Sequence, residues 1–378
     1  MSCRGLVAMA CVLFLVGCTH EGDQAGECDD GADNDRDGLF DCGDPDCSGS
    51  PDCGGDDDDS GDDDSGDDDD TGDDDDTGDD DTGDDDDSTP VGVWRQVASG
   101  RYNSCGVRND KTLECWGADG QDQSTPPSGA NYLQVDAGKY HACAVRDDGG
   151  VDCWGCGDDP YDYEQCSAPA GTSFVEVTAT RHHTCGLKAD GSIECWGCEG
   201  ELAGYPGVFV DAGQCDAPAT GTFVQISSGD DHTCAVGNDN SVECWGCGDE
   251  DGDYGQCVVP AGEFLYVSCD ATHTCAVRSD LEVQCWGSNS NGKSNPPDGT
   301  FTQLATGRHH SCGVNTDADL ECWGCSDLNY DYGQCDPPTG TYQHVSGGQA
   351  HVCGLDTAGD LACWGCGVDL DYGQCDPP

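Results

Sequence analysis

The sequence predicts an all-β protein whose main domain is a disulfide-rich, seven-bladed β-propeller. From Val93 onward the chain repeats itself, and the copies contain short alternating strands separated by Gly, Asp and Pro turns, with no helical periodicity. Repeats of about 40 residues with several strands each are typical of propeller blades. The tryptophan of a recurrent Cys-Trp-Gly motif marks seven copies, at Trp116, Trp154, Trp196, Trp245, Trp286, Trp323 and Trp364.

The first residues of the chain are typical of an export signal. Arg4 precedes an apolar run from Leu6 to Val16, which is too short to span a bilayer as a helix. The Leu-Val-Gly-Cys motif that ends at Cys18 resembles the lipobox of bacterial lipoproteins, which implies a signal peptide at residues 1–17 and lipidation of Cys18. Thr19 after this cysteine favours the outer membrane. The alternative is an ordinary secretory signal in which Cys18 is incidental.

Residues 18–53 form a small acidic segment bracketed by cysteines. Its oxygen-bearing side chains follow the spacing of a calcium loop, with Gly38 at the sixth position. The segment resembles thrombospondin type 3 loops, which implies disulfides of open connectivity among its cysteines and a Ca²⁺ site at Asp33, Asp35, Asp37, Asp41 and Asp44. Because Asp reaches less far than Glu, we expect weak binding, on the order of 10⁻⁴ to 10⁻³ M. The alternative is an acidic spacer with accidental spacing.

Residues 54–89 form an aspartate tract with 22 Asp in 36 residues and no apolar side chain. Such a segment has nothing to bury and repels itself, so we expect a disordered, extended spacer. A divalent-ion sponge is the alternative. The composition changes after this tract, and residues 90–378 are expected to form the propeller.

Two cysteines stand ten positions apart in every copy. Pairing residue i with i+10 places them directly opposite each other across a hairpin with a three-residue loop, within disulfide reach. Zinc ligation is the rival, although zinc sites usually gather Cys-x-x-Cys pairs. The pairs are Cys105 and Cys115, Cys143 and Cys153, Cys185 and Cys195, Cys234 and Cys244, Cys275 and Cys285, Cys312 and Cys322, and Cys353 and Cys363.

A second set of cysteines encloses the loop that follows Trp-Gly. Copies one and five lack both partners together, which argues that the two bond to each other where present. Cys269 is left over, either as a buried free thiol or as an intermolecular link. The expected pairs are Cys156 and Cys166, Cys198 and Cys215, Cys247 and Cys257, Cys325 and Cys335, and Cys366 and Cys375.

The His-Thr-Cys, Asp-Gly and Cys-Trp-Gly elements of the copies resemble the regulator of chromosome condensation repeats, which implies a seven-bladed propeller over Val93–Pro378. The richness in cysteine resembles the bacterial secreted branch of that family. The guanine-nucleotide exchange known for eukaryotic relatives fits poorly, because residues 90–378 hold 11 basic and 43 acidic residues, a charge that repels nucleic acid. An exported protein also does not meet a cytosolic GTPase.

A histidine precedes the first hairpin cysteine by two positions in six copies, and Asn103 replaces it in the first. A ring of metal-binding imidazoles is one interpretation. Because a fold needs recurrence and a site needs asymmetry, we favour a repeated structural hydrogen bond within each blade. The histidines are His141, His183, His232, His273, His310 and His351.

We therefore expect a lipid-anchored protein of the bacterial cell envelope, in the outer membrane or at the cell surface, whose propeller binds an unknown protein or glycan and no nucleic acid. No nucleophile with a neighbouring base stands out, so we expect no enzyme activity. Inhibition of a secreted enzyme is the alternative function, and a propeller hydrolase or lyase is disfavoured. Tyrosines suit contact surfaces, and the third copy has a longer loop that is either a contact or a tolerated insertion. The expected binding residues are Tyr161, Tyr163, Tyr205, Phe209, Tyr254, Tyr330, Tyr332 and Tyr372.

Overall fold

A computed structural model describes residues 93–156, 163–198, 213–247, 253–325 and 330–378. The chain divides into two compact units, Met1–Ser88 and Thr89–Pro378, and the described residues belong to the second. The expected lipid attachment at Cys18, the expected calcium loop and the aspartate tract lie outside the described residues. Within the described ranges, no helix is long and apolar enough to cross a membrane.

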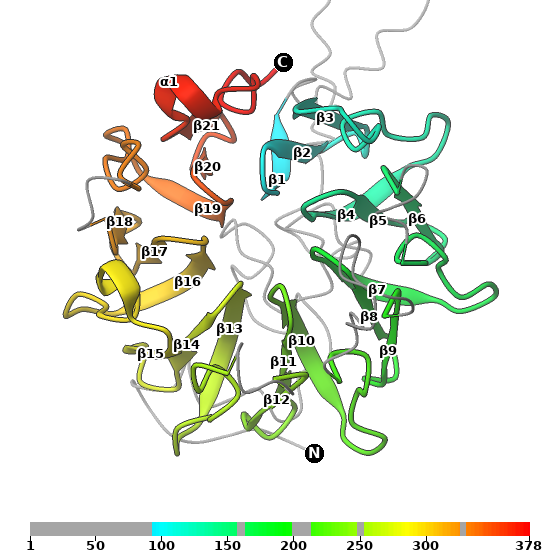
Figure 1. The fold of residues 1–378 in the computed structure, drawn as a ribbon, viewed down its shortest axis with the longest axis horizontal. Helices are drawn as coiled ribbons and strands as arrows, with labels where there is room; N and C mark the ends of the chain where they lie inside the picture. The colour runs from blue at the N-terminus through cyan, green and yellow to red at the C-terminus, as the bar shows by residue number, and fades with distance from the viewer. Residues whose placement is uncertain (1–92, 157–162, 199–212, 248–252, 326–329) are drawn as a thin grey trace, which may run out of the picture. The chain divides into compact units, whose positions relative to one another are not determined.

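The described chain folds into seven antiparallel three-stranded sheets around a central axis (Figure 1). The innermost strands are β1 (Trp94–Ser99), β4 (Tyr132–Ala137), β7 (Phe174–Ala179), β10 (Phe223–Ser228), β13 (Phe264–Asp270), β16 (Phe301–Thr306) and β19 (Tyr342–Gly347). The middle strands are β2 (Asn103–Arg108), β5 (Ala142–Arg146), β8 (Thr184–Lys188), β11 (Thr233–Gly237), β14 (His273–Arg278), β17 (Ser311–Asn315) and β20 (Val352–Asp356). The outer strands are β3 (Leu113–Gly117), β6 (Val151–Trp154), β9 (Ile193–Trp196), β12 (Val242–Trp245), β15 (Val283–Gly287), β18 (Leu320–Trp323) and β21 (Leu361–Trp364).

The innermost strands contact one another all the way round, and β1 contacts both β4 and β19. Two short helical turns, η4 (Ser290–Gly292) and α1 (Gly367–Leu370), follow the outer strands of the fifth and seventh sheets. Each sheet corresponds to one sequence repeat, so the predicted fold class, a seven-bladed all-β propeller, is confirmed.

Each middle strand turns into its outer strand through a hairpin with the same backbone conformation. The loop length predicts a left-handed residue at the last loop position, and glycine or asparagine stands there in four blades. The structure gives this position a positive φ in every blade, at Lys111, Gly149, Gly191, Asn240, Leu281, Ala318 and Gly359. A side chain in this conformation costs on the order of 1–2 kcal/mol, so the repeat geometry overrides local preference in three blades.

Disulfides join the described cysteines in twelve pairs. Seven connect directly opposed residues of a middle and an outer strand, with Cα atoms 4.0–4.1 Å apart, and they are the seven hairpin pairs given above. Five staple the loop after the outer strand, with Cα atoms 6.0–6.1 Å apart, and they are the five loop pairs given above. Cys269 is buried and free.

The tryptophan beside each hairpin disulfide fills space between blades. In the first blade, the ring centroid of Trp116 lies 5.7 Å from that of Trp94. In the third blade Trp196 packs in one cluster with Cys143 of the second blade. Gly106, which follows a hairpin cysteine, leaves room for these rings, because a Cβ there would lie 2.5 Å from the Trp94 ring. The disulfides and rings therefore form one layer between neighbouring blades.

The first and last blades of the propeller are joined by the same contacts as any other two neighbouring blades. The Trp154 indole nitrogen donates a hydrogen bond to the Gln123 main-chain oxygen in the preceding blade, at 2.9 Å. Trp116 of the first blade donates in the same way to Gln374 of the last blade, also at 2.9 Å. The sequence leaves open whether a strand near Val93 completes the last blade; β1 instead pairs with β2 of its own blade.

Candidate binding face at the mouth of the central channel

We use the name mouth face for one end of the propeller. It comprises the loops between innermost and middle strands and the described parts of the loops that follow the outer strands. The two sets touch, since the Ala118 amide donates to the Tyr102 oxygen at 2.8 Å and the Ser288 amide donates to the Thr272 oxygen at 2.9 Å. Aromatic contacts join them as well, with the Tyr102 and Tyr372 rings 5.1 Å apart.

A cavity of about 210 Å³ lies on the axis and is lined by residues of all seven innermost strands. Adjacent innermost strands belong to different sheets, so their main-chain groups need partners other than a strand ladder. Glutamine side chains supply them. Gln96 donates to the Val135 oxygen at 3.0 Å and accepts from the Val135 amide at 2.8 Å, and Gln134 bridges to Val177 in the same way.

Other residues take the glutamine's place in three blades. Glu176 accepts a hydrogen bond from the Ile226 amide at 3.2 Å. Burial raises the pKa of Glu176 to about 8, and the Asp136 carboxylate adds to this shift. His344 donates from Nε2 to the Val97 oxygen at 2.8 Å, which links the last blade to the first. Tyr266 stands at this position in the fifth blade.

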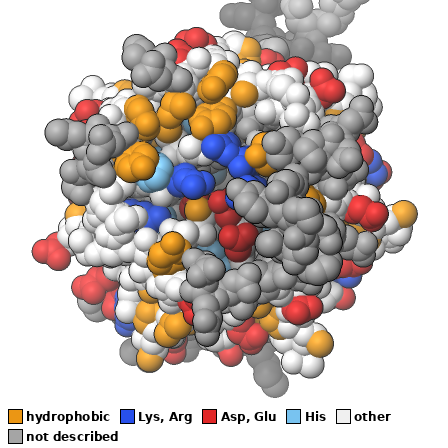
Figure 2. Space-filling view, viewed as in Figure 1, with side chains coloured by type: hydrophobic (Ala, Val, Ile, Leu, Met, Phe, Trp, Pro, Cys, Tyr) orange, Lys and Arg blue, Asp and Glu red, His pale blue; other side chains and the backbone are white. Residues whose placement is uncertain are grey.

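One residue from each inner loop stands at the corresponding place around the mouth. Main-chain bonds fix their order, since the Arg101 amide donates to the Gly138 oxygen at 3.4 Å and the Lys139 amide donates to the Thr180 oxygen at 3.0 Å. Four of the seven are cations, although the 90–378 region carries a net charge of −32. Figure 2 shows Lys and Arg side chains beside Asp and Glu at the centre of this view. The seven residues are Gln349, Arg101, Lys139, Arg181, Asp230, Ala271 and Arg308.

The cations of the first three blades crowd one another. Burial lowers the pKa of Lys139 to about 7, and repulsion from Arg181 and Arg101 contributes, while Asp230 opposes the shift. Arg308 differs because its guanidinium lies 3.7 Å from an Asp230 carboxylate oxygen. The mouth is thus polar and asymmetric, with a basic side at the first three blades.

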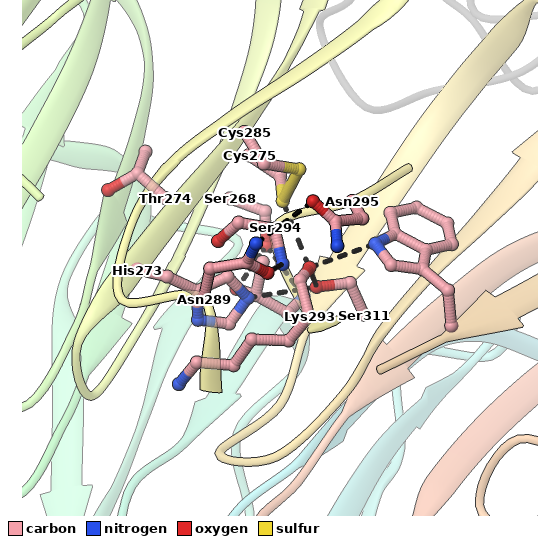
Figure 3. The surroundings of a disulfide bond; sticks show 12 residues. Ser268, His273, Thr274, Cys275, Cys285, Asn289, Lys293, Ser294, Asn295 and Ser311 are labelled. Carbon is pink, nitrogen blue, oxygen red and sulfur yellow. Dashed lines mark hydrogen bonds between the residues drawn. A yellow bond between two sulfur atoms is a disulfide. The ribbon is translucent and has the colours of Figure 1, made fainter. Parts of the chain in front are cut away.

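The opposite side of the mouth holds a buried lysine. Lys293 replaces the glutamine that the other six blades carry in the loop after the outer strand. Its main-chain oxygen keeps the structural role, accepting from the Ser311 hydroxyl at 3.0 Å (Figure 3). Its ammonium donates to the Thr272 hydroxyl and the Arg308 oxygen, each at 2.9 Å. Burial lowers the pKa of Lys293 to about 8 and raises that of Asp270 to about 7, while each charge favours the other's ionised form.

The expected binding tyrosines separate into distinct groups. Tyr254, Tyr330 and Tyr372 are 54%, 44% and 54% exposed on the mouth face. Tyr332 is half-buried. Tyr163 is only 3% exposed, with its ring edge-on to His182 at 5.0 Å, so its prediction as a contact residue is wrong. Tyr161, Tyr205 and Phe209 lie outside the described residues.

The repeated histidines form hydrogen bonds between blades, which corrects the expectation of a bond within each blade. The Nε2 atom of His141 lies 2.8 Å from the Thr184 hydroxyl of the next blade, and that of His351 lies 2.9 Å from the Ser104 hydroxyl. Burial lowers the pKa of His141 to about 3, so the ring is neutral. The same contact recurs for His183, His232 and His273.

The histidine contact predicts opposite effects of two matched substitutions. Thr184→Val leaves the buried His141 nitrogen without its partner and should lower the free energy of unfolding by about 1–3 kcal/mol. His310 faces Val352 instead, and within the described residues its Nε2 atom has no hydrogen-bond partner. Val352→Thr should therefore raise the free energy of unfolding by about 0.5–1.5 kcal/mol. Chemical denaturation with intact disulfides measures both, and two changes of the same sign contradict the assignment.

Among the described residues, His232, Cys234 and Cys269 are the one cluster with ligand atoms close enough for a metal, within 4.8 Å of one another. Cys234 is bonded to Cys244 and offers no thiolate. Burial raises the pKa of the Cys269 thiol to about 12. With Cys234 in a disulfide, the cluster offers two ligand side chains, fewer than the four of a structural zinc site.

The cations of the mouth are functional candidates that sequence reasoning missed. Their signal is present, since Arg101, Lys139, Arg181 and Arg308 each stand four residues before a hairpin cysteine. A strand pattern does not show, however, that this position faces the axis, where the residues of separate repeats meet.

The comparisons with known proteins agree with the repeat and the fold. The sequence profile of the regulator of chromosome condensation (RCC1) repeat matches residues 133–159 and 223–256. No curated protein matches the sequence of this chain.

Solved structures of other propellers resemble the described domain. The CRINKLY WD40 ectodomain of the receptor kinase ACR4 from Arabidopsis thaliana is 20% identical, with a TM-score of 0.55 over 72% of this chain and 97% of that chain. The ectodomain of the receptor kinase CR4 from Physcomitrella patens is 23% identical, with a TM-score of 0.56 over 72% and 74%. Human WBSCR16 is 15% identical, with a TM-score of 0.55 over 70% and 87%. These likenesses show the fold, and the two profile matches lie in the second and fourth blades.

Proposed function

We propose that this protein is an exported binding module, whose propeller presents its mouth face to a protein or glycan partner. Twelve disulfides among the described residues favour an extracellular or envelope location, because such bonds persist in oxidising compartments. In this proposal, Cys18 carries the lipid anchor, the acidic segment at 18–53 binds Ca²⁺ weakly, and the aspartate tract at 54–89 holds the propeller away from the membrane. Inhibition of a secreted enzyme would be one form of protein binding by this face.

The observation that carries the proposal is the concentration of irregular, exposed features on the mouth face. The strands, hairpins and disulfides repeat in every blade and serve the fold. A tyrosine recurs two residues before the loop glutamine in four blades, but its exposure differs between them, since Tyr163 is 3% and Tyr254 54% exposed. The charged cavity residues also differ from blade to blade. Tyrosine provides a large contact area with little side-chain entropy to lose. A rigid scaffold that presents exposed aromatic and charged groups, arranged differently in each blade, around a cavity is suited to binding.

The proposal predicts that ligand binding depends on the mouth-face tyrosines. Immobilised full-length chain is probed with an array of purified glycans and with proteins from culture medium. Replacing Tyr254, Tyr330 and Tyr372 together by serine should weaken any specific ligand at least tenfold, since aromatic anchors each contribute about 1–2 kcal/mol or more. The matched control replaces Val175 and Val224, which are each 52% exposed at the starts of their strands, away from the mouth face.

Loss of binding in the valine variant, or retention in the tyrosine variant, contradicts the assignment to the mouth face. Turnover of a glycan by the intact protein would replace binding with catalysis as its function.

A further inference from the structure

The basic side of the mouth contains cations without counter-charges. Arg101 and Lys139 come from adjacent blades, and both line the axial cavity. Neither forms a salt bridge with any described residue, and the Arg101 Nε atom is buried without a hydrogen-bond partner. Cations that are partly removed from water, with no paired anion, are costly for a fold to hold. Their retention together indicates a group that the cavity receives from outside.

An exposed aromatic ring lies beside these cations. The Arg101 guanidinium lies 4.9 Å from the centre of the Tyr102 ring, and the Lys139 ammonium lies 4.5 Å from that of Tyr140. The Tyr102 ring in turn lies 5.1 Å from the ring of Tyr372, which is 54% exposed. A ligand that reaches Arg101 therefore also meets the face or edge of Tyr372.

The charge of the rest of the domain restricts the class of ligand. Residues 90–378 carry a net charge of −32, which repels polyanions such as nucleic acids and acidic peptides. A ligand with one localised anionic group on a neutral, polar body avoids this repulsion and still neutralises the basic side. Carboxylate-bearing sugars have this chemistry, and their rings stack on tyrosine.

We propose that the mouth face binds the carboxylate of an acidic sugar, such as a uronic acid at the end of a glycan. Arg101 and Lys139 bind the carboxylate by charge-assisted hydrogen bonds, and Tyr372 packs against the sugar ring. The inference rests on the proposed function, since it assigns a ligand class to the same face. It agrees with the electrostatics of Lys139, whose pKa is lowered to about 7 by burial and by Arg181 and Arg101, with Arg308 adding to the repulsion and Asp230 opposing it.

The test titrates glucuronate, glucose and inorganic sulfate into the full-length protein at low ionic strength, with calorimetry as the readout. Glucuronate should bind at least tenfold more tightly than glucose or sulfate. The double variant Arg101→Gln with Lys139→Gln should weaken glucuronate at least tenfold, the loss expected for charge-assisted hydrogen bonds. The control, Lys188→Gln with Arg278→Gln, removes the same charges from the far ends of the third and fifth middle strands and should change affinity less than twofold. Titrations in two buffers of different ionisation enthalpy should show proton uptake above pH 7, because a bound carboxylate raises the pKa of Lys139.

Several outcomes overturn the inference. Equal affinity of the double variant and its control for glucuronate does so, once equal denaturation midpoints show that both variants are folded. The inference is also overturned if sulfate binds as tightly as glucuronate, because the sugar ring would then not be recognised. It is overturned likewise if glucose binds as tightly, because the carboxylate would then not be recognised. If neutral glycans or a protein bind through Tyr254, Tyr330 and Tyr372 while glucuronate does not, this inference fails and the proposed function stands. If nothing binds the mouth face, both fail.

Discussion

Replacing Cys143 and Cys153 together by alanine should lower the free energy of unfolding by at least about 3 kcal/mol. The disulfide closes a short loop with a sequence separation of 10, and opening it returns about that much chain entropy to the unfolded state. Cys143 is also fully buried and packs in a cluster with Trp196 of the next blade, so the lost sulfur leaves unfilled space. Chemical denaturation under non-reducing conditions measures the loss.

The loop disulfide of the same blade provides the control. Cys156 and Cys166 have the same sequence separation of 10, so unfolded-state entropy alone predicts an equal loss. The first blade has alanine and serine at these positions, and there the Ser124 hydroxyl donates to the Ala118 oxygen at 2.8 Å. Cys156→Ala with Cys166→Ser should therefore cost much less, because the native loop can relax when the staple is removed. Equal losses would contradict the view that the hairpin bonds hold the blades together and the loop bonds do not.

The sequence was sufficient for the fold because the repeat supplies internal comparisons. Ten-residue cysteine spacing sets the register of each hairpin, since only one register brings the two residues opposite each other. Joint loss of the loop cysteines in copies one and five identifies the second set of partners. These arguments use residues within one blade, and the blade is a local unit whose geometry follows from strand alternation and turn length.

Contacts between blades could not be predicted in the same way. Tyr163 and Tyr254 occupy equivalent positions two residues before the loop glutamine, yet they are 3% and 54% exposed. Tyr163 is buried because the next blade places His182 against its ring, whereas Thr272 stands at the position equivalent to His182 in the blade after Tyr254. The histidine bonds, the glutamine bridges and the basic side of the mouth depend likewise on which residues of two repeats face each other across the ring. A single copy does not contain that information.

Glu176 is expected to make the stability of the propeller fall as pH rises. Its pKa is raised from 4.5 to about 8 by burial, so the native state binds more protons than the unfolded state between these values. The free energy of unfolding therefore decreases through this interval, by a total on the order of 3–5 kcal/mol from this group. The equivalent position of the preceding blade shows which groups the site requires. There Gln134 donates a hydrogen bond to the Val177 oxygen and accepts one from the Val177 amide. A protonated carboxyl group can offer the same donor and acceptor, and a carboxylate has no donor.

Glu176→Gln should remove this pH dependence by supplying a permanent donor. At pH 5 the variant and the parent should have nearly equal free energies of unfolding, and at pH 9 the variant should be more stable by several kcal/mol. The reverse substitution, Gln134→Glu, should introduce a second loss between pH 5 and pH 9 in the neighbouring blade. Denaturation curves of all three proteins at both pH values separate this effect from the titration of Asp270 and Lys293, which is common to them and cancels in the differences. Equal pH dependence in parent and Glu176→Gln would show that Glu176 is ionised in the native state, and that the interblade bridge of the third blade does not need the donor that its neighbours have.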